Sequence, residues 1–338
     1  MRYFGSDNQS GVHPAVVEAL LRANADHCLA YGNDPWTERA VGRFKDIFGQ
    51  DTGVCFVFGG TGANVAAVSS LVRSYHAVIC SSFSHLYVDE CGSPETVTGC
   101  KLIPIEVENA KLTVQSIEGQ LHRLGNEHAV QPRVVSITQP NEYGMLYTPR
   151  EMKALCDFAH SNGLCVHVDG ARITNAAARL GIGLREATRD LGVDALCFGG
   201  TKNGLMFGEA VLFFDPVLFE AARYFRKKAT QLASKMRFIS AQFEAFLSND
   251  LWLQIANHAN RMAARLAGAI EGIPGVAVSR PVETNMVWTC VEPAQVVSLG
   301  KHYPLALLGK KQEELRWVTS FDTTQEDIEA FVHALTEG

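Results

Sequence analysis

Short apolar runs alternate with helical patterns through the first two-thirds of the chain. The apolar or β-branched runs that are typical of strands lie at 53–58, 78–81, 101–105, 134–138, 164–168, 195–198 and 210–214. Apolar residues recur at helical spacing over 13–25, 37–48, about 62–74, 114–124 and 149–161. Strands that alternate with helices indicate a mostly parallel sheet with helices packed on it.

The last third of the chain follows a different pattern. Residues 215–269 carry helical patterns without a strong strand pattern. Short alternating runs at 276–278, 285–290 and 315–319 then predict a smaller sheet, and 324–335 predicts a closing helix. We therefore predict an α/β protein with a large domain over 1–247, which begins with an N-terminal arm over 1–13, and a small C-terminal domain over 248–338.

Composition excludes several classes of protein. Hydrophobic residues make up 47% of the chain and charged residues 20%, as in ordinary globular enzymes. The net charge of −6 gives no reason to expect binding to nucleic acid or to a membrane surface. There is no apolar run long enough to span a bilayer and no signal-peptide pattern. The nine scattered cysteines favour free thiols in the cytoplasm over a disulfide framework or a metal site.

Two charged residues follow neighbouring strand patterns. Asp169 comes directly after the run at 164–168, and Lys202 follows the run at 195–198 and two glycines. The carboxyl ends of parallel strands meet at the edge where open α/β sheets bind their ligands. A lysine there can hold a carbonyl cofactor as a Schiff base, and a carboxylate can keep a pyridine nitrogen protonated. An aspartate at a strand end is also a common helix cap, which leaves a structural alternative for Asp169.

A glycine turn and a histidine follow the first two strand patterns. Residues 59–64 read Gly-Gly-Thr-Gly-Ala-Asn between a strand and a helix, where backbone N–H groups can bind phosphate. A tight structural turn is the equal alternative. His85 follows the second strand and can stack on a flat ring or transfer a proton. Glu90, five residues later, can position a water or be an exposed charge.

Several arginines could bind anions. Arg172 lies three residues after Asp169 and can bind an anionic group or simply pair with Asp169. Arg316 lies in a strand-like run and can hold a carboxylate with two parallel hydrogen bonds if it faces inward. Lys235 and Arg237 form a cationic pair that can contact a phosphate or stay solvated.

Taken together, these motifs resemble the pyridoxal-phosphate-dependent threonine aldolases. The most specific parts are Asp-Gly-Ala-Arg at 169–172 and Gly-Gly-Thr-Lys-Asn-Gly at 199–204, and the resemblance covers nearly the whole chain. It implies the aspartate-aminotransferase-like fold (fold type I), with a mostly parallel seven-stranded sheet in the large domain. It also implies a homodimer or homotetramer with active sites shared between subunits.

The resemblance implies a role for each candidate residue. Lys202 would bind pyridoxal phosphate covalently, Asp169 would pair with the pyridine nitrogen, and His85 would stack on the ring. The candidate base is His85 or a water held by His85 and Glu90. The groups implied for the phosphate are Gly60, Thr61, Gly62 and Arg237. The groups implied for the substrate carboxylate are Ser6, Arg172 and Arg316, with Arg172 also near the cofactor. Tyr31 would reach into the site of a neighbouring subunit.

The chain departs from part of this family after the strand at 134–138. Many members carry a histidine in that loop, whereas residues 138–144 here read Thr-Gln-Pro-Asn-Glu-Tyr-Gly. This resembles the branch of low-specificity and phenylserine aldolases. The identity of the base that serves the substrate's β-hydroxyl is therefore open.

The sequence predicts an aldolase that cleaves the Cα–Cβ bond of L-threonine, L-allo-threonine or related L-3-hydroxy amino acids. Two alternatives remain. One is a β-eliminating lyase on the same fold that acts on an aromatic or sulfur amino acid. The other is a non-catalytic or nucleotide-binding α/β protein, which would be colourless when purified.

Overall fold

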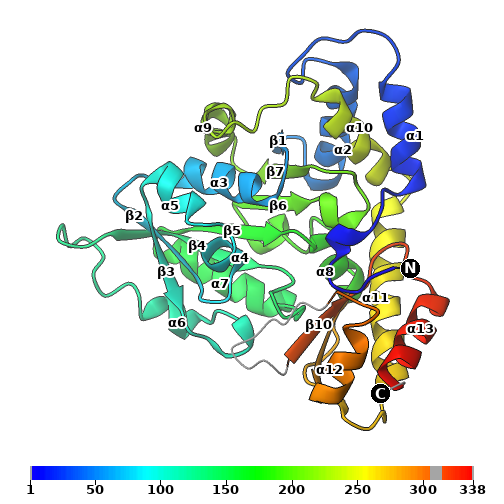
Figure 1. Cartoon of the computed structure of the whole chain (residues 1–338). Helices are drawn as coiled ribbons and strands as arrows, with labels where there is room; N and C mark the ends of the chain where they lie inside the picture. Colours follow the sequence, from blue (N-terminus) through cyan, green and yellow to red (C-terminus); the bar gives the residue numbers. More distant parts are fainter. Residues whose placement is uncertain (1, 305–313, 337–338) are drawn as a thin grey trace.

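A seven-stranded sheet forms the centre of the large domain (Figure 1). In the computed structural model, which describes residues 2–304 and 314–336, the strands lie in the order β1-β7-β6-β5-β4-β2-β3. Their bounds are β1 (Gly53–Val57), β2 (His76–Ser81), β3 (Lys101–Ile105), β4 (Gln131–Thr138), β5 (Cys165–Gly170), β6 (Ala195–Gly199) and β7 (Glu209–Phe213). β2 to β6 pair in parallel, while β7 runs antiparallel to both β1 and β6. The predicted mostly parallel sheet is confirmed.

Helices pack on both faces of this sheet. The longer ones are α1 (Pro14–Ala23), α2 (Pro35–Phe48), α3 (Gly60–Leu71), α7 (Pro149–Ser161), α8 (Ile173–Leu180), α9 (Pro216–Lys228) and α10 (Arg237–Phe246). Neighbouring residues of a strand point to opposite faces, so Phe56 packs with the aromatic cluster under α2 and α10 while Val57 packs with α3. Burial on both sides explains why the strands read as continuous apolar runs.

A second sheet of three antiparallel strands forms the small domain. Its order is β10 (Glu314–Val318), β9 (Met286–Val291) and β8 (Val276–Val278). The helices α11 (Leu251–Ile270), α12 (Pro293–Leu299) and α13 (Gln325–Thr336) accompany it. The predicted division near residue 248 falls between α10 and α11, and it stays a prediction.

The N-terminal arm is attached to the small domain. Phe4 is 1% exposed and packs against Phe331 and Tyr303 in the core of that domain. Its carbonyl oxygen accepts a hydrogen bond from the backbone N–H of Val318 in β10 at 2.7 Å. The arm therefore lies along the edge of the small sheet before the chain enters the large domain.

The short elements differ most from the sequence prediction. α6 (Val114–Glu118) ends at Gly119, well before the predicted end of a helix at 124. Several one- or two-turn helices carry too few residues to show helical spacing. These are α4 (His85–Val88), α5 (Ser93–Thr98), η1 (Asp7–Gln9), η2 (Glu108–Ala110), η3 (Arg189–Leu191) and η4 (Thr201–Asn203). None of the helices in the described ranges is long and apolar enough to cross a membrane.

Candidate active site

The predicted site residues gather where the parallel strands end. Asp169 lies near the end of β5, Lys202 lies in η4 directly after β6, and His85 begins α4 after β2. The glycine turn after β1 opens α3 at the same edge. The structure thus brings together four segments that the sequence separates by up to about 140 residues.

Asp169 is a buried and ionised carboxyl group. Its Oδ2 accepts a hydrogen bond from Asn64 Nδ2 at 2.9 Å, and its Oδ1 accepts one from the backbone N–H of Ala171 at 3.0 Å. Burial raises its pKa, but these hydrogen bonds and the charge of Lys202 outweigh it and hold the pKa below the usual value. The residue that caps α8 is Arg172, so the helix-cap alternative for Asp169 does not hold.

Asn64 connects two of the predicted carboxyl groups. Its Nδ2 donates to Glu90 Oε1 at 2.7 Å as well as to Asp169. The sequence shows Asn64 only as the end of the glycine turn, so its role was not predicted. One sequence feature could have indicated this role: Asn64 is an amide in a helix of small and apolar residues, where a buried polar side chain needs a hydrogen-bond partner.

His85 and Glu90 form a hydrogen-bonded pair. His85 Nδ1 lies 2.8 Å from Glu90 Oε1 because α4 ends at Val88 and the chain then turns back. The hydrogen bond that the His85 imidazole donates to Glu90 raises the pKa of His85, while burial raises the pKa of Glu90. A hydrogen bond at Nδ1 leaves Nε2 of the imidazole for other partners. The sequence did not show whether these two side chains meet, and in the structure they do.

Glu142 occupies the loop that lacks a histidine. Its Oε1 accepts hydrogen bonds from Thr138 Oγ1 at 2.7 Å and from the backbone N–H of His85 at 3.1 Å. Burial raises the pKa of Glu142 to about 7. A carboxyl group therefore fastens this loop to the start of α4, a contact that the sequence does not signal.

The turn that carries Lys202 needs its glycines. A Cβ on Gly199 would lie 2.1 Å from the carbonyl oxygen of Ala171, and Gly204 has φ +86°. The N–H of Gly200 donates to the buried Glu209 at 2.6 Å, which closes the turn against β7. The charge of Arg172, together with burial, lowers the pKa of Lys202. A lowered pKa increases the fraction of the amine that is neutral and nucleophilic.

The start of α3 is an open cradle. A Cβ on Gly59 or Gly60 would meet no atom within 4 Å, and no side chain caps the helix. Gln231 borders the cradle: its Oε1 accepts a hydrogen bond from the N–H of Phe58 at 3.1 Å, and it leaves no room for a Cβ on Gly62. Unpaired N–H groups at a helix start suit an anion.

Arg237 and Tyr31 contact loop residues in the described part of the chain. Arg237 begins α10, and its Nη1 donates to the carbonyl oxygen of Asp26 at 3.0 Å. Tyr31 is 50% exposed, with its N–H bonded to the carbonyl oxygen of Ser234. The predicted roles of Arg237 at the phosphate and of Tyr31 at a neighbouring site stay predictions.

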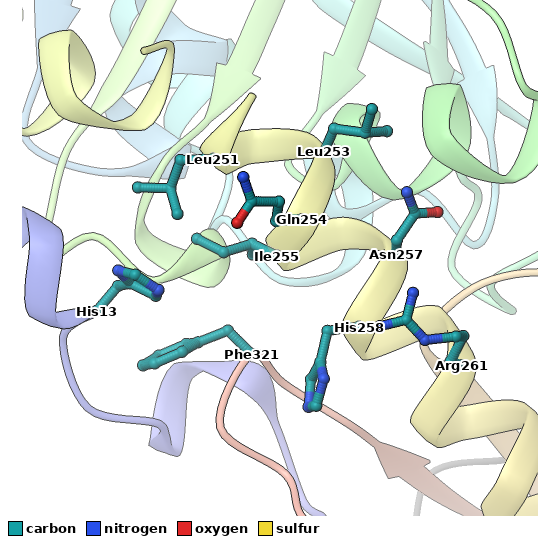
Figure 2. Close-up of a pocket in the computed structure, with 9 residues that line it drawn as sticks. All are labelled: His13, Leu251, Leu253, Gln254, Ile255, Asn257, His258, Arg261 and Phe321. Atoms are coloured by element: carbon teal, nitrogen blue, oxygen red, sulfur yellow. The ribbon is translucent and has the colours of Figure 1, made fainter. Parts of the chain in front are cut away.

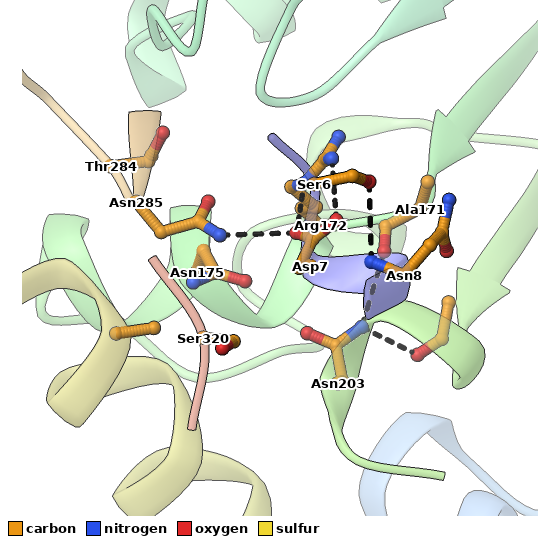
Figure 3. A network of polar contacts seen from close by, with 12 residues as sticks. Ser6, Asp7, Asn8, Ala171, Arg172, Asn175, Asn203, Thr284, Asn285 and Ser320 are labelled. Carbon is orange, nitrogen blue, oxygen red and sulfur yellow. Dashed lines mark hydrogen bonds and ion pairs between the residues drawn. The ribbon is translucent and has the colours of Figure 1, made fainter. Parts of the chain in front are cut away.

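Arg172 pairs with Asp7 rather than with Asp169 (Figure 3). Arg316 lies in β10, where Nη2 makes a 3.4 Å contact with the carbonyl oxygen of Gly5, and its buried Nε has no hydrogen-bond partner within residues 2–304 and 314–336. Burial and the charge of Arg172 lower the pKa of Arg316, so the two guanidinium groups face a common region. Ser6 uses its Oγ to accept a hydrogen bond from the N–H of Asn8. These residues form the side of the site that we call the clamp: Ser6, Asp7, Arg172, Asn285 and Arg316.

A cavity of about 510 Å³ lies outside this constellation (Figure 2). It runs along α11, and His13 and Phe321 lie on its other side. A Cβ on Gly204 would come within 3.2 Å of His13 and 3.3 Å of Phe321, so the cavity lies behind the Lys202 turn. It contains none of the predicted site residues.

In the described ranges no group of three or more His, Cys, Asp or Glu side chains could hold a metal ion.

The fold and the site define a fold type I enzyme. A protein from Escherichia coli with a methionine aminotransferase function superimposes with a TM-score of 0.72 over 97% of this chain and 91% of its own, at 13% identity. The match at that identity concerns the fold alone. More similar proteins share the family as well as the fold.

A family model described as "Beta-eliminating lyase" matches residues 4–292. The low-specificity L-threonine aldolase of Pseudomonas aeruginosa is 46% identical over 293 residues, which cover 86% of this chain and 85% of that protein. A threonine aldolase structure from Leishmania major superimposes with a TM-score of 0.93 over 99% of both chains, at 29% identity. The chain belongs to the β-eliminating lyase family and, within it, to the low-specificity L-threonine aldolases. The predicted fold type, family and aldolase function are thereby confirmed.

Proposed function

We propose that this chain uses pyridoxal phosphate to cleave L-threonine, L-allo-threonine and related L-3-hydroxy amino acids, including L-phenylserine, to glycine and an aldehyde. The observation that carries the proposal is the convergence of Asp169, Lys202 and His85 at one sheet edge beside an open helix start. The low-specificity L-threonine aldolase of Pseudomonas aeruginosa, at 46% identity, supports the reaction.

The residues at the sheet edge fit pyridoxal phosphate. An uncapped helix start suits its phosphate, and the ionised Asp169 suits a protonated pyridine nitrogen. Lys202 offers a half-buried amine with a lowered pKa. When bound, the group supplies an electron sink for the pair released from the Cα–Cβ bond. We propose that Gly60, Thr61 and Gly62 hold the phosphate and that Arg237 assists.

The chain's own residues orient the substrate and move the protons. Arg172 and Arg316, with Ser6, would bind the substrate carboxylate, which fixes the rotation of the bond to be cleaved. His85 would accept the β-hydroxyl proton at Nε2, because Glu90 occupies Nδ1. The raised pKa of His85 makes the ring a stronger base than an isolated imidazole.

We also propose a homodimer or homotetramer in which Tyr31 reaches a neighbouring site. Tyr31 is 50% exposed in a single chain, so it is accessible to a neighbouring subunit.

We propose further that the protein acts in the cytoplasm, because its nine cysteines are all free thiols.

The test is a product analysis of the purified, cofactor-loaded protein with L-threonine, L-allo-threonine and L-phenylserine. Equal amounts of glycine and the corresponding aldehyde are expected. 2-Oxobutyrate and ammonia from L-threonine, in place of glycine and acetaldehyde, would favour β-elimination. A protein without the yellow colour of the bound cofactor would contradict both activities.

A further inference from the structure

A buried ion pair ties the N-terminal arm to Arg172 (Figure 3). Arg172 donates through Nε to Oδ2 of Asp7 at 2.6 Å and through Nη2 to Oδ1 at 2.8 Å. The side chain of Asp7 is 1% exposed and that of Arg172 is 11% exposed. Two parallel hydrogen bonds fix both the position and the plane of a guanidinium group. The two bonds to Asp7 occupy the Nε and Nη2 edge of the Arg172 guanidinium and leave Nη1 available to donate to another group.

Asp7 is itself held from the small domain. Asn285 Nδ2 donates to Oδ2 of Asp7 at 3.1 Å and to the carbonyl oxygen of Thr319 at 2.9 Å. Three residues before Asp7, Phe4 lies in the small-domain core and bonds to the backbone of Val318. The carboxylate is therefore anchored on both sides. It cannot readily follow Arg172 or move aside.

Asp7 also neutralises part of a crowded positive region. The charge of Arg172 contributes to the lowered pKa values of both Lys202 and Arg316, which shows that the three cations interact. Burial raises the pKa of Asp7, but Arg172, Lys202 and the bond from Asn285 bring it below the usual value. The buried Nε of Arg316 has no hydrogen-bond partner among the described residues, which leaves this donor for one more anion beside Asp7.

We propose that Asp7 is a positioning residue: it holds one edge of Arg172 so that the remaining edge, together with Arg316, binds the α-carboxylate of the amino acid. The inference rests on the proposed role of Arg172 and Arg316 at that carboxylate. The opposite arrangement has Asp7 occupying the carboxylate's place and competing with the substrate. The anchoring of Asp7 by Asn285 and by the arm favours the positioning role.

The two arrangements predict opposite signs for one substitution. Asp7→Asn keeps the size of the side chain but removes its charge and one of the two acceptors. We expect KM for L-threonine, and the dissociation constant for glycine followed through the cofactor's absorbance, to rise about tenfold or more, while kcat changes less than about threefold. An unchanged or lower dissociation constant for glycine overturns the proposal.

Asp51→Asn is the matched control. Asp51 also accepts two hydrogen bonds from one arginine, at 2.7 Å each, but from Nη1 and Nη2 of Arg189 rather than from an Nε edge, and its own side chain is 54% exposed. The substitution there should leave KM and glycine binding unchanged, since a surface pair contributes little. An equal rise in both variants would mean a general effect of losing an Asp–Arg pair, which contradicts positioning at the site.

Arg172→Ala separates the inference from the proposed function. If the wild-type enzyme cleaves L-threonine and Arg172→Ala weakens glycine binding, the proposed role of the clamp is supported. If Asp7→Asn then leaves glycine binding unchanged, only the positioning role of Asp7 is contradicted. If Arg172→Ala is also without effect, the clamp and the inference both fail. The double variant should bind glycine no more weakly than Arg172→Ala, because the two residues act as one unit.

Asn285→Ala keeps the proposal testable if Asp7→Asn does not fold. It leaves the Asp7–Arg172 pair in place and removes one anchor of Asp7. Glycine binding should weaken by about threefold, with kcat retained. Unchanged glycine binding in a folded Asn285→Ala variant would contradict the anchored, positioning carboxylate.

Discussion

Buried carboxyl groups lie on two sides of the site, and their charges are balanced in opposite ways. On the clamp side, Asp7 faces the guanidinium of Arg172 and its pKa is lowered. On the opposite side, which holds His85, Glu142 accepts hydrogen bonds from a hydroxyl and a backbone N–H and lies near the negative charge of Asp169, and burial raises its pKa to about 7. Burial is common to both, so the partner decides whether the buried group keeps its charge. The clamp side is thus set up to bind an anion, and the histidine side to hold and release protons.

Lys202→Ala removes the amine whose charge acts on both the clamp side and the histidine side. The charge of Lys202 helps to lower the pKa values of Asp7 and of Asp169. Removing the nucleophilic amine should reduce the cleavage rate by about a thousandfold or more. The absorbance band of the covalently bound cofactor should disappear as well. An unchanged band would show that another amine holds the cofactor.

Arg316→Lys tests the clamp side alone. A lysine keeps the charge but loses the planar fork, so KM for L-threonine should rise by about ten- to a hundredfold with a smaller change in kcat. Steady-state kinetics on the two enzymes measure this. Arg39→Lys, which alters a half-exposed pair with Glu244, is the control and should behave as wild type. A fall in kcat with KM unchanged would place Arg316 outside carboxylate binding.

Glu142→Gln tests the histidine side through stability. The pKa of Glu142 in the folded protein lies above its ordinary value, so the folded state binds the proton more tightly than the unfolded state. Its contribution is present at low pH and is lost as pH rises through about 7. The glutamine variant lacks this loss and should gain up to about 3 kcal/mol on wild type between about pH 5 and 8. Urea unfolding across that range measures it, and a difference that does not change with pH would contradict the shifted pKa.

The sequence marks the residues at the strand ends more clearly than it marks the contacts between distant segments. Strand ends, a glycine turn and the residues Asp169, Lys202 and His85 are local signals that a single sequence displays. The pairing of Asp7 with Arg172 joins positions 165 residues apart, and no local pattern marks it. Arg172 was expected to pair with Asp169 or with an anion, and Asp7 was seen only as part of a motif.

Glu142 and Asn64 escaped prediction for a different reason. Both lie in segments that the sequence marks, the loop without a histidine and the glycine turn. A glutamate in a loop is ordinarily solvated, and an asparagine after a turn is ordinarily a capping residue. The folded chain gives these side chains buried partners from other segments: the N–H of His85 for Glu142, and the carboxylates of Glu90 and Asp169 for Asn64.

The attachment of the arm to the small domain has a consequence for biosynthesis. Phe4 and Asp7 are synthesised before the large sheet, whereas the groups that hold them, Phe331, Val318 and Asn285, are synthesised after it. The large sheet can form while the chain is still growing, because its strands are complete by Phe213. The clamp is therefore the last part of the site to assemble, and a nascent chain with a finished sheet still lacks a means of binding its substrate.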